Sequence, residues 1–196
     1  MRAAMLLGAW LVLFPLGHRH QGSGLASRLS PGTKLFYVSD GREQPPWVVD
    51  SVQIAQALKP GADCATLTLR RKPEDPKLER SRLCVASDTL YRWEKGAWAV
   101  SRPVGPDMSL TLVKANGDSV HYETGALGED MVSGNAIAVV STTVTTVDAS
   151  GRARLRVRER YALSLATAVS GTFEAPDPAA RGLWILKHTF ALKELR

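Results

Sequence analysis

The sequence predicts an all-β fold, a single antiparallel meander of about ten strands that forms a closed or half-open β-barrel. Short segments rich in β-branched and aromatic residues alternate with turn clusters at fairly even intervals. Five arginines occupy every second position over 152–160, which is the side-chain period of a strand. The turns are short, which favours a meander over long crossovers. A two-sheet β-sandwich is the alternative.

The first residues have the pattern of a signal peptide. Residues 3–17 carry no charge and are rich in Leu, Ala, Val, Phe and Trp. This stretch has the length of a signal-peptide apolar region and is shorter than the roughly 20 residues that span a bilayer. Gly24 and Ala26 place small residues where a signal peptidase reads them, so we expect cleavage after Ala26. The predicted organisation is a signal peptide at 1–26 and one all-β domain at 27–196, with an uncleaved membrane anchor as the alternative.

The N-terminal part of the domain predicts two strands before the first long hairpin. Residues 35–38 form the first strand, which ends at the turn Ser39-Asp-Gly41. The second strand covers 47–54 and follows the break at Pro45-Pro46. The stretch 54–58 is the one place where a short helix could form.

The two cysteines, Cys64 and Cys84, predict a disulfide. Two β-rich segments flank a turn-forming stretch at 72–77, and a hairpin that turns around Glu74 places the cysteines directly opposite each other. A pair of this kind in an exported chain is usually bonded. There is no Cys-x-x-Cys spacing, so the predicted role is structural rather than catalytic.

Two tight hairpins follow. A turn at Lys95-Gly96 pairs Trp93 with Trp98 across neighbouring strands at 90–93 and 98–101. The dipeptide Asn116-Gly117 predicts the next hairpin, between 110–113 and 119–122. The Trp93/Trp98 pair is expected to stabilise its hairpin, although an exposed pair would offer a stacking platform for a sugar or an apolar chain.

The C-terminal third contains the longest predicted strands. Residues 136–147 are Ala, Val, Ile, Ser and Thr only, with no charge. Asp148 and Gly151 occupy the first and fourth positions of a type I turn, after which the arginine strand returns antiparallel. The last strand covers 183–192.

The arginine stripe is the sharpest pattern in the chain, and its members are Arg152, Arg154, Arg156, Arg158 and Arg160. In a strand all five share one face, while the other face is mostly apolar. The stripe is either a solvated outer face or an anion-binding surface that contacts phosphate, carboxylate or sulfate. Like charges about 7 Å apart on one face repel, so without acidic partners the stripe needs counter-ions or a ligand.

Catalytic signatures are absent from the sequence. Glu159 interrupts the apolar face of the arginine strand and could act as a general base with His121 or Asp50. No His-x-His or His-Glu-x-x-His spacing is present, and His121 and His188 are expected to be structural or surface residues rather than metal ligands. We expect no cofactor and no metal. The net charge of +6 is too low a density for a nucleic-acid-binding domain.

These features favour an exported, non-enzymatic binding or carrier module of the cell envelope, in the periplasm or outside the cell. Small exported barrels with an interior cavity commonly carry apolar ligands, here a lipid or another amphiphile with an anionic head. Two alternatives stay open: a structural or interaction protein of the envelope, whose stripe meets an acidic membrane surface, and an acid-base enzyme that uses Glu159.

Overall fold

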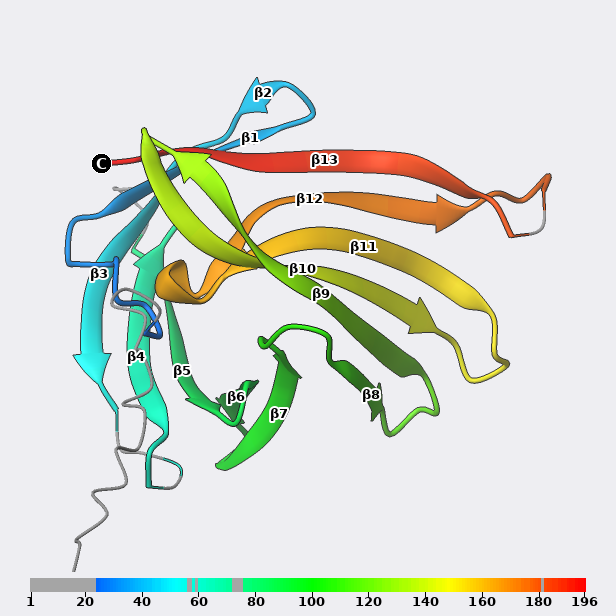
Figure 1. The fold of residues 1–196 in the computed structure, drawn as a ribbon, viewed down its shortest axis with the longest axis horizontal. Coiled ribbons are helices and arrows are strands. Elements are labelled where there is room, and N and C mark those ends of the chain that lie inside the picture. The colour runs from blue at the N-terminus through cyan, green and yellow to red at the C-terminus, as the bar shows by residue number, and fades with distance from the viewer. Residues whose placement is uncertain (1–23, 56–57, 59, 72–75, 181) are drawn as a thin grey trace, which may run out of the picture.

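The computed structural model describes residues 24–196 except 56–57, 59, 72–75 and 181, and this part of the chain is almost entirely extended (Figure 1). Most of the predicted signal peptide therefore lies outside the described residues. One 3₁₀ turn, η1 (Leu163–Leu165), interrupts the strands. The strands are β1 (Lys34–Ser39), β2 (Arg42–Glu43), β3 (Trp47–Ile54), β4 (Asp63–Arg70), β5 (Leu78–Ala86), β6 (Thr89–Glu94), β7 (Ala97–Pro103), β8 (Ser109–Val113), β9 (Ser119–Val132), β10 (Asn135–Val147), β11 (Ala153–Ala162), β12 (Thr167–Pro176) and β13 (Trp184–Leu195).

All strands belong to one antiparallel sheet that curls into a nearly closed barrel, as predicted. The order across the sheet is β7-β6-β5-β4-β3-β1-β13-β12-β11-β10-β9-β8, with β2 beside β1. The chain thus makes two meanders, β1 to β7 and β8 to β13, and they join where β1 pairs with β13. The two edge strands, β7 and β8, lie near each other in Figure 1, so the sheet almost closes on itself.

The predicted hairpin registers are confirmed. Cys64 lies opposite Cys84 between β4 and β5, and the two form a disulfide; the predicted turn at Glu74 lies outside the described residues. Trp93 lies opposite Trp98, with ring centroids 5.4 Å apart in an edge-to-face arrangement. Arg82 lies 4.7 Å from the Trp93 ring centroid, so a protein side chain already occupies the proposed stacking platform.

The C-terminal turn also forms as expected, because the Gly151 N–H donates to the Asp148 carbonyl at 2.9 Å. The possible helix at 54–58 does not extend to its first residue, since Ile54 is the last residue of β3. Positions 56–57 of that segment lie outside the described residues.

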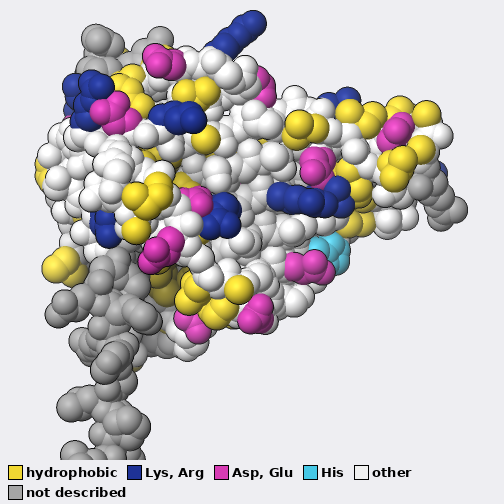
Figure 2. Space-filling view, turned by 45° about the horizontal axis from the view of Figure 1, so that its top comes forward, with side chains coloured by type: hydrophobic (Ala, Val, Ile, Leu, Met, Phe, Trp, Pro, Cys, Tyr) yellow, Lys and Arg dark blue, Asp and Glu magenta, His cyan; other side chains and the backbone are white. Residues whose placement is uncertain are grey.

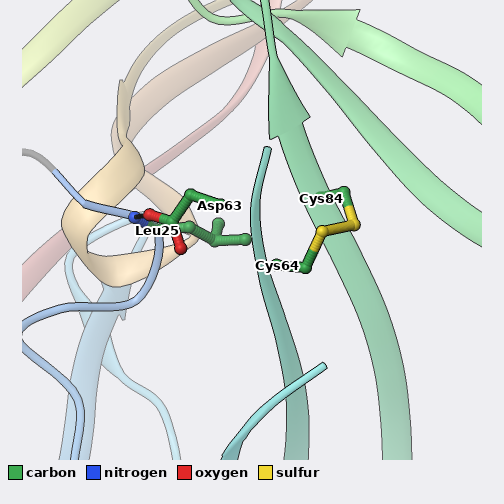
Figure 3. The surroundings of a disulfide bond; sticks show 4 residues. All are labelled: Leu25, Asp63, Cys64 and Cys84. Atoms are coloured by element: carbon green, nitrogen blue, oxygen red, sulfur yellow. Dashed lines mark hydrogen bonds between the residues drawn. A yellow bond between two sulfur atoms is a disulfide. The ribbon is translucent and has the colours of Figure 1, made fainter. Parts of the chain in front are cut away.

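The core lies inside the barrel and at one of its ends. Its most deeply buried side chains come from strands on both sides of the barrel and from η1, among them Val49, Leu67, Leu83, Ile137, Val139 and Leu165. Leu25 and Ala26 join this core: the Ala26 N–H donates to the Leu163 carbonyl at 3.0 Å, and the Leu25 N–H donates to Asp63 Oδ2 at 2.7 Å. Figure 3 shows Leu25 beside Asp63, the residue that precedes Cys64 of the disulfide. Cleavage after Ala26 stays a prediction, and it would remove these contacts.

The disulfide generates a stability prediction. It closes a loop with a sequence separation of 20, and a cross-link of that length lowers the entropy of the unfolded chain by an amount worth about 3 kcal/mol. We expect the double substitution Cys64→Ser, Cys84→Ser to lower the free energy of unfolding by that amount in urea titrations. The wild type in a reducing agent should match the variant. If reduction leaves the urea midpoint of the wild type unchanged, the bond does not stabilise this hairpin.

Candidate functional site

A cavity of about 910 Å³ lies in the barrel interior between β1, β3 to β6 and β12 to β13. The apolar part of its lining comes from strand residues, Leu35, Trp47, Leu67, Leu69, Leu83, Phe173 and Phe190, and from Leu165 of η1. The β4–β5 register turns one face of both strands inward, because Leu67 lies opposite Ser81 and Ala65 lies opposite Leu83. The volume is at the upper end of the range for ligand pockets, about 300–1,000 Å³.

Aromatic rings form one wall of the cavity. The Phe190 ring centroid lies 6.4 Å from that of Tyr37 and 5.8 Å from that of Phe173. The Tyr37 hydroxyl donates to the Ala168 carbonyl at 3.0 Å, and burial raises the pKa of this phenol to about 12. Tyr37 therefore stays neutral under physiological conditions, and its ring adds apolar surface to the wall.

Two arginines border the cavity. Arg71 follows β4 and its guanidinium lies 5.5 Å from the Trp47 ring centroid, which places the cation beside an apolar wall. Arg92 lies opposite Leu83 in the β5–β6 ladder and so shares the inward face. Among the described residues no ion pair joins either arginine to a carboxylate, although Glu79 borders the same cavity. The cavity thus combines an apolar interior with two cations available to an anionic group.

Sequence reasoning missed both arginines. Arg71 lies at the end of a predicted strand next to a second arginine, Arg70, and the sequence does not distinguish the roles of the two. In the structure Arg70 forms an ion pair with Asp50, whereas Arg71 borders the cavity. Arg92 lies between Tyr91 and Trp93, in a hairpin for which the sequence analysis considered only the Trp93/Trp98 pair. The two-residue period of strands was the signal that could have found them. Leu67 and Leu69 indicate the inward face of their strand, and Arg71 is the next residue on that face. Arg92 lies directly opposite the inward-facing Leu83.

The arginine stripe lies on the opposite face of β11 from Tyr161, which is buried. Arg154 pairs with Asp148 at 2.5 Å, Arg156 with Glu174 at 2.5 Å, and Arg160 with Asp130 at 2.8 Å. Arg158 Nε lies 3.7 Å from the same Glu174 carboxylate. The acidic partners that the stripe needs therefore come from the turn, from the adjacent strand β12 and from β9, the next strand but one, and the stripe is largely charge-neutralised.

Arg152 is not part of the strand. β11 begins at Ala153, and the Arg152 N–H donates to Asp148 Oδ1 at 2.9 Å within the turn. A register irregularity between Thr146 and Val147 accompanies this arrangement: Thr146 lies opposite Leu155 and Val147 opposite Ala153, so Arg154 lies opposite no residue of β10. The face shared by the stripe thus begins at Arg154.

A second hollow of about 760 Å³ is bordered by β9 to β12, and Arg158 and Arg160 contribute to its lining together with Glu123, Glu159 and Glu174. Acidic side chains match the basic ones there. Figure 2 shows the same mixture on a whole face of the molecule, where Lys and Arg side chains are interspersed with Asp and Glu. The charge balance gives this hollow less attraction for an anion than the two arginines at the barrel cavity have.

Glu159 forms an ion pair with Arg102 of β7 inside the barrel, and their side chains are only 12% and 13% exposed. The Arg102 guanidinium also lies 4.3 Å from the Tyr161 ring centroid. This cluster links β7 to β11, which are far apart in the sheet order. Removing one partner of a buried ion pair leaves the other charge unpaired and destabilises the fold. The Arg102–Glu159 pair is therefore a structural contact that holds β7 against β11.

The structure does not bring Glu159 together with its two candidate partners. In the ladders, Glu159 lies opposite Thr142 and His121 lies opposite Thr145, an odd spacing along β10 that places the two side chains on opposite faces of the sheet. His121 hydrogen-bonds to Thr111 and Ser119, and Asp50 pairs with Arg70. The acid-base pairs considered from the sequence are therefore not assembled.

Comparisons with known proteins found no match to any protein-family model, curated protein or solved structure. Within the described ranges, no helix has both the length and the apolar character needed to cross a membrane. The cavity and its two arginines are consequently the features on which a functional proposal depends.

The turn at Asp148 generates a prediction for pH dependence. Hydrogen bonds from the Ser150 hydroxyl and the Arg152 N–H, together with the charge of Arg154, lower the pKa of Asp148 from 3.8 to about 2. A carboxyl whose pKa is lower in the folded state stabilises the fold above its unfolded pKa, and this contribution disappears as pH falls through the folded value. We expect Asp148→Asn to lower the melting temperature at pH 7 and to have a much smaller effect at pH 2, where about half of the folded molecules already carry a protonated Asp148. A difference between variant and wild type that is equal at both pH values would contradict this account of the turn.

Proposed function

We propose that this chain is an exported carrier that binds a lipid or another amphiphile with an anionic head in its barrel cavity. The observation that carries the proposal is the cavity itself, about 910 Å³ in volume, with leucine and aromatic side chains in its lining and two arginines at its border. The hydrophobic effect provides roughly 25 cal/mol per Å² of apolar surface removed from water, so an alkyl chain that lies along this lining gains affinity in proportion to its length.

The head group is expected to lie at Arg71 and Arg92. An arginine guanidinium matches a carboxylate or phosphate with two parallel hydrogen bonds, and it is weakly hydrated compared with a lysine ammonium. The Trp47 ring holds the Arg71 guanidinium beside the apolar wall. The ligand chemistry therefore follows from the site: an apolar chain inside the barrel, and an anionic group at the cations.

Export is the second part of the proposal. The uncharged stretch at 3–17 supports it, and so does the Cys64–Cys84 disulfide, because such bonds persist in oxidising compartments and are rare in the cytosol.

A titration with a fluorescent fatty acid tests whether the cavity binds. We expect saturable binding with one ligand per chain, and we expect Ser81→Trp to abolish it, because Ser81 lines the cavity and an indole there would fill the space of the alkyl chain. The matched control is Ser109→Trp, an exposed position of β8 outside the lining. Binding that survives Ser81→Trp would place the ligand elsewhere. No saturable binding to the wild type would favour a structural or interaction protein instead.

A second titration tests where the head group lies. Losing charge-assisted hydrogen bonds costs about 1.5–3 kcal/mol each, so Arg71→Ala with Arg92→Ala should weaken fatty-acid binding by about 100-fold or more. The same double variant should bind the corresponding fatty alcohol as the wild type does. The control pair is Arg154→Ala with Arg158→Ala on the stripe, which should leave both ligands unaffected. If the stripe variants lose fatty-acid binding and the cavity variants do not, the anion site is the stripe.

A further inference from the structure

Three polar side chains at the border of the cavity form a hydrogen-bonded chain that the proposed carrier function does not use. Ser39 Oγ lies 2.8 Å from Nε2 of His188, and His188 Nδ1 is hydrogen-bonded to Asp40 Oδ2. Ser39 and His188 both line the cavity. The serine, the histidine and the carboxylate are connected in the order, and through the ring nitrogens, that nucleophilic acyl transfer requires.

The fold assembles this group from the two ends of the domain. Ser39 is the last residue of β1 and lies opposite Phe190 of β13, which brings it beside His188 although 149 residues separate them in sequence. Asp40 follows in the tight turn to β2, where its φ of 47° and the φ of 76° at Gly41 are the positive values of a type I′ hairpin. That turn directs the Asp40 carboxylate back onto β13.

Asp40 fixes the state of the histidine ring. Its Oδ1 accepts hydrogen bonds from the Thr189 N–H at 2.7 Å and from the Thr189 hydroxyl at 3.2 Å, which leaves Oδ2 for the ring. These bonds, the backbone one first, hold the pKa of Asp40 below its usual value, so the group is a carboxylate and only accepts. His188 Nδ1 must then carry the proton, and Nε2 is free to accept the Ser39 hydroxyl proton.

The surroundings suit an ester with an apolar acyl group. The Phe173 ring lies 5.5 Å from the His188 ring, and Phe173 and Phe190 continue from the histidine into the apolar wall. The His188 and Asp40 side chains are 42% and 52% exposed, so water reaches the group. Gln44 lines the same cavity and pairs through its N–H with the Tyr37 carbonyl, two residues before Ser39. Its side-chain Nε2 donates one N–H to the Arg42 carbonyl at 3.3 Å, so the second N–H of this amide is the one left for an oxyanion.

We propose that Ser39, His188 and Asp40 form a nucleophilic site that hydrolyses carboxylic esters whose acyl chain occupies the cavity. Ser39 Oγ adds to the ester carbonyl carbon while its proton passes to His188 Nε2. The carbon–oxygen bond to the alcohol breaks, the alcohol takes the proton from His188, and the acyl group stays on Ser39. Water then attacks the acyl carbon and gives a proton to His188. The bond between the acyl carbon and Ser39 Oγ breaks, Ser39 Oγ takes the proton back from His188, and the carboxylic acid is released.

The choice of an acyl chain as the substrate rests on the proposed function of the cavity, but the chemistry of the three residues does not. A fluorophosphonate probe and a short-chain p-nitrophenyl ester test the chemistry by itself, because neither needs the apolar cavity. We expect the fluorophosphonate to modify Ser39, as read by mass spectrometry of the labelled peptide, and we expect the ester to be hydrolysed.

Four variants of the full chain make the test specific. Ser39→Ala and His188→Gln should abolish labelling and lower hydrolysis by about 100-fold or more. Asp40→Asn keeps the turn, since asparagine also tolerates a positive φ, but its amide nitrogen would donate to Nδ1 and force the unproductive tautomer; it should lose activity to a similar degree. The matched control is Ser109→Ala, a serine of β8 outside the cavity lining, which should behave as the wild type.

The outcomes separate this inference from the carrier function. No labelling of the wild type, or labelling that persists in Ser39→Ala, overturns the nucleophilic site. The carrier function is then decided separately, by the fatty-acid titration. Labelling and short-ester hydrolysis without any preference for longer acyl chains, in a protein that does not bind fatty acids, would keep the nucleophilic site and overturn the carrier.

Discussion

The pairing of β1 with β13 is the interaction on which the rest of the structure depends. It joins two separate meanders into one sheet, and without it the chain would have two open sheets rather than a barrel. The cavity exists because this junction brings the Leu67 and Leu83 face of the first meander opposite the Phe173 and Phe190 face of the second. The same junction places Ser39 beside His188. Fold, cavity and reactive group therefore share one cause.

Local patterns in the sequence predicted much of this architecture because hairpins are encoded locally. The Cys64–Cys84 register, the Trp93–Trp98 pair and the Asp148 turn all follow from turn residues and the two-residue period of strands, and all three are confirmed. β9 was predicted only as 119–122 although it extends to Val132. Its distal half contains Gly125 and Gly128 and faces a register irregularity in β10, so no regular alternation marks it.

Contacts between distant strands could not be predicted in this way. The sequence identified the arginine stripe as the strongest charge pattern, yet its acidic partners come from a turn and from two other strands, β12 and β9, and a single strand does not reveal them. The less conspicuous Arg71 and Arg92 gained their importance only when the barrel directed them to the cavity. Likewise, Ser39, Asp40 and His188 are unremarkable residues until the first and last strands meet. Regular charge spacing was a good guide to strand geometry and a poor guide to the candidate site.

The central claim is that the barrel cavity holds an amphiphile, and native mass spectrometry of the protein purified from its own host tests it most directly. The account predicts a population whose mass exceeds that of the polypeptide by one ligand. Organic extraction should release this ligand, and its mass spectrum should show an apolar chain with an anionic group. The adduct should be missing from protein that carries a tryptophan at position 81. A protein that is homogeneously ligand-free, or a ligand that is retained equally when the cavity is filled, would contradict the account.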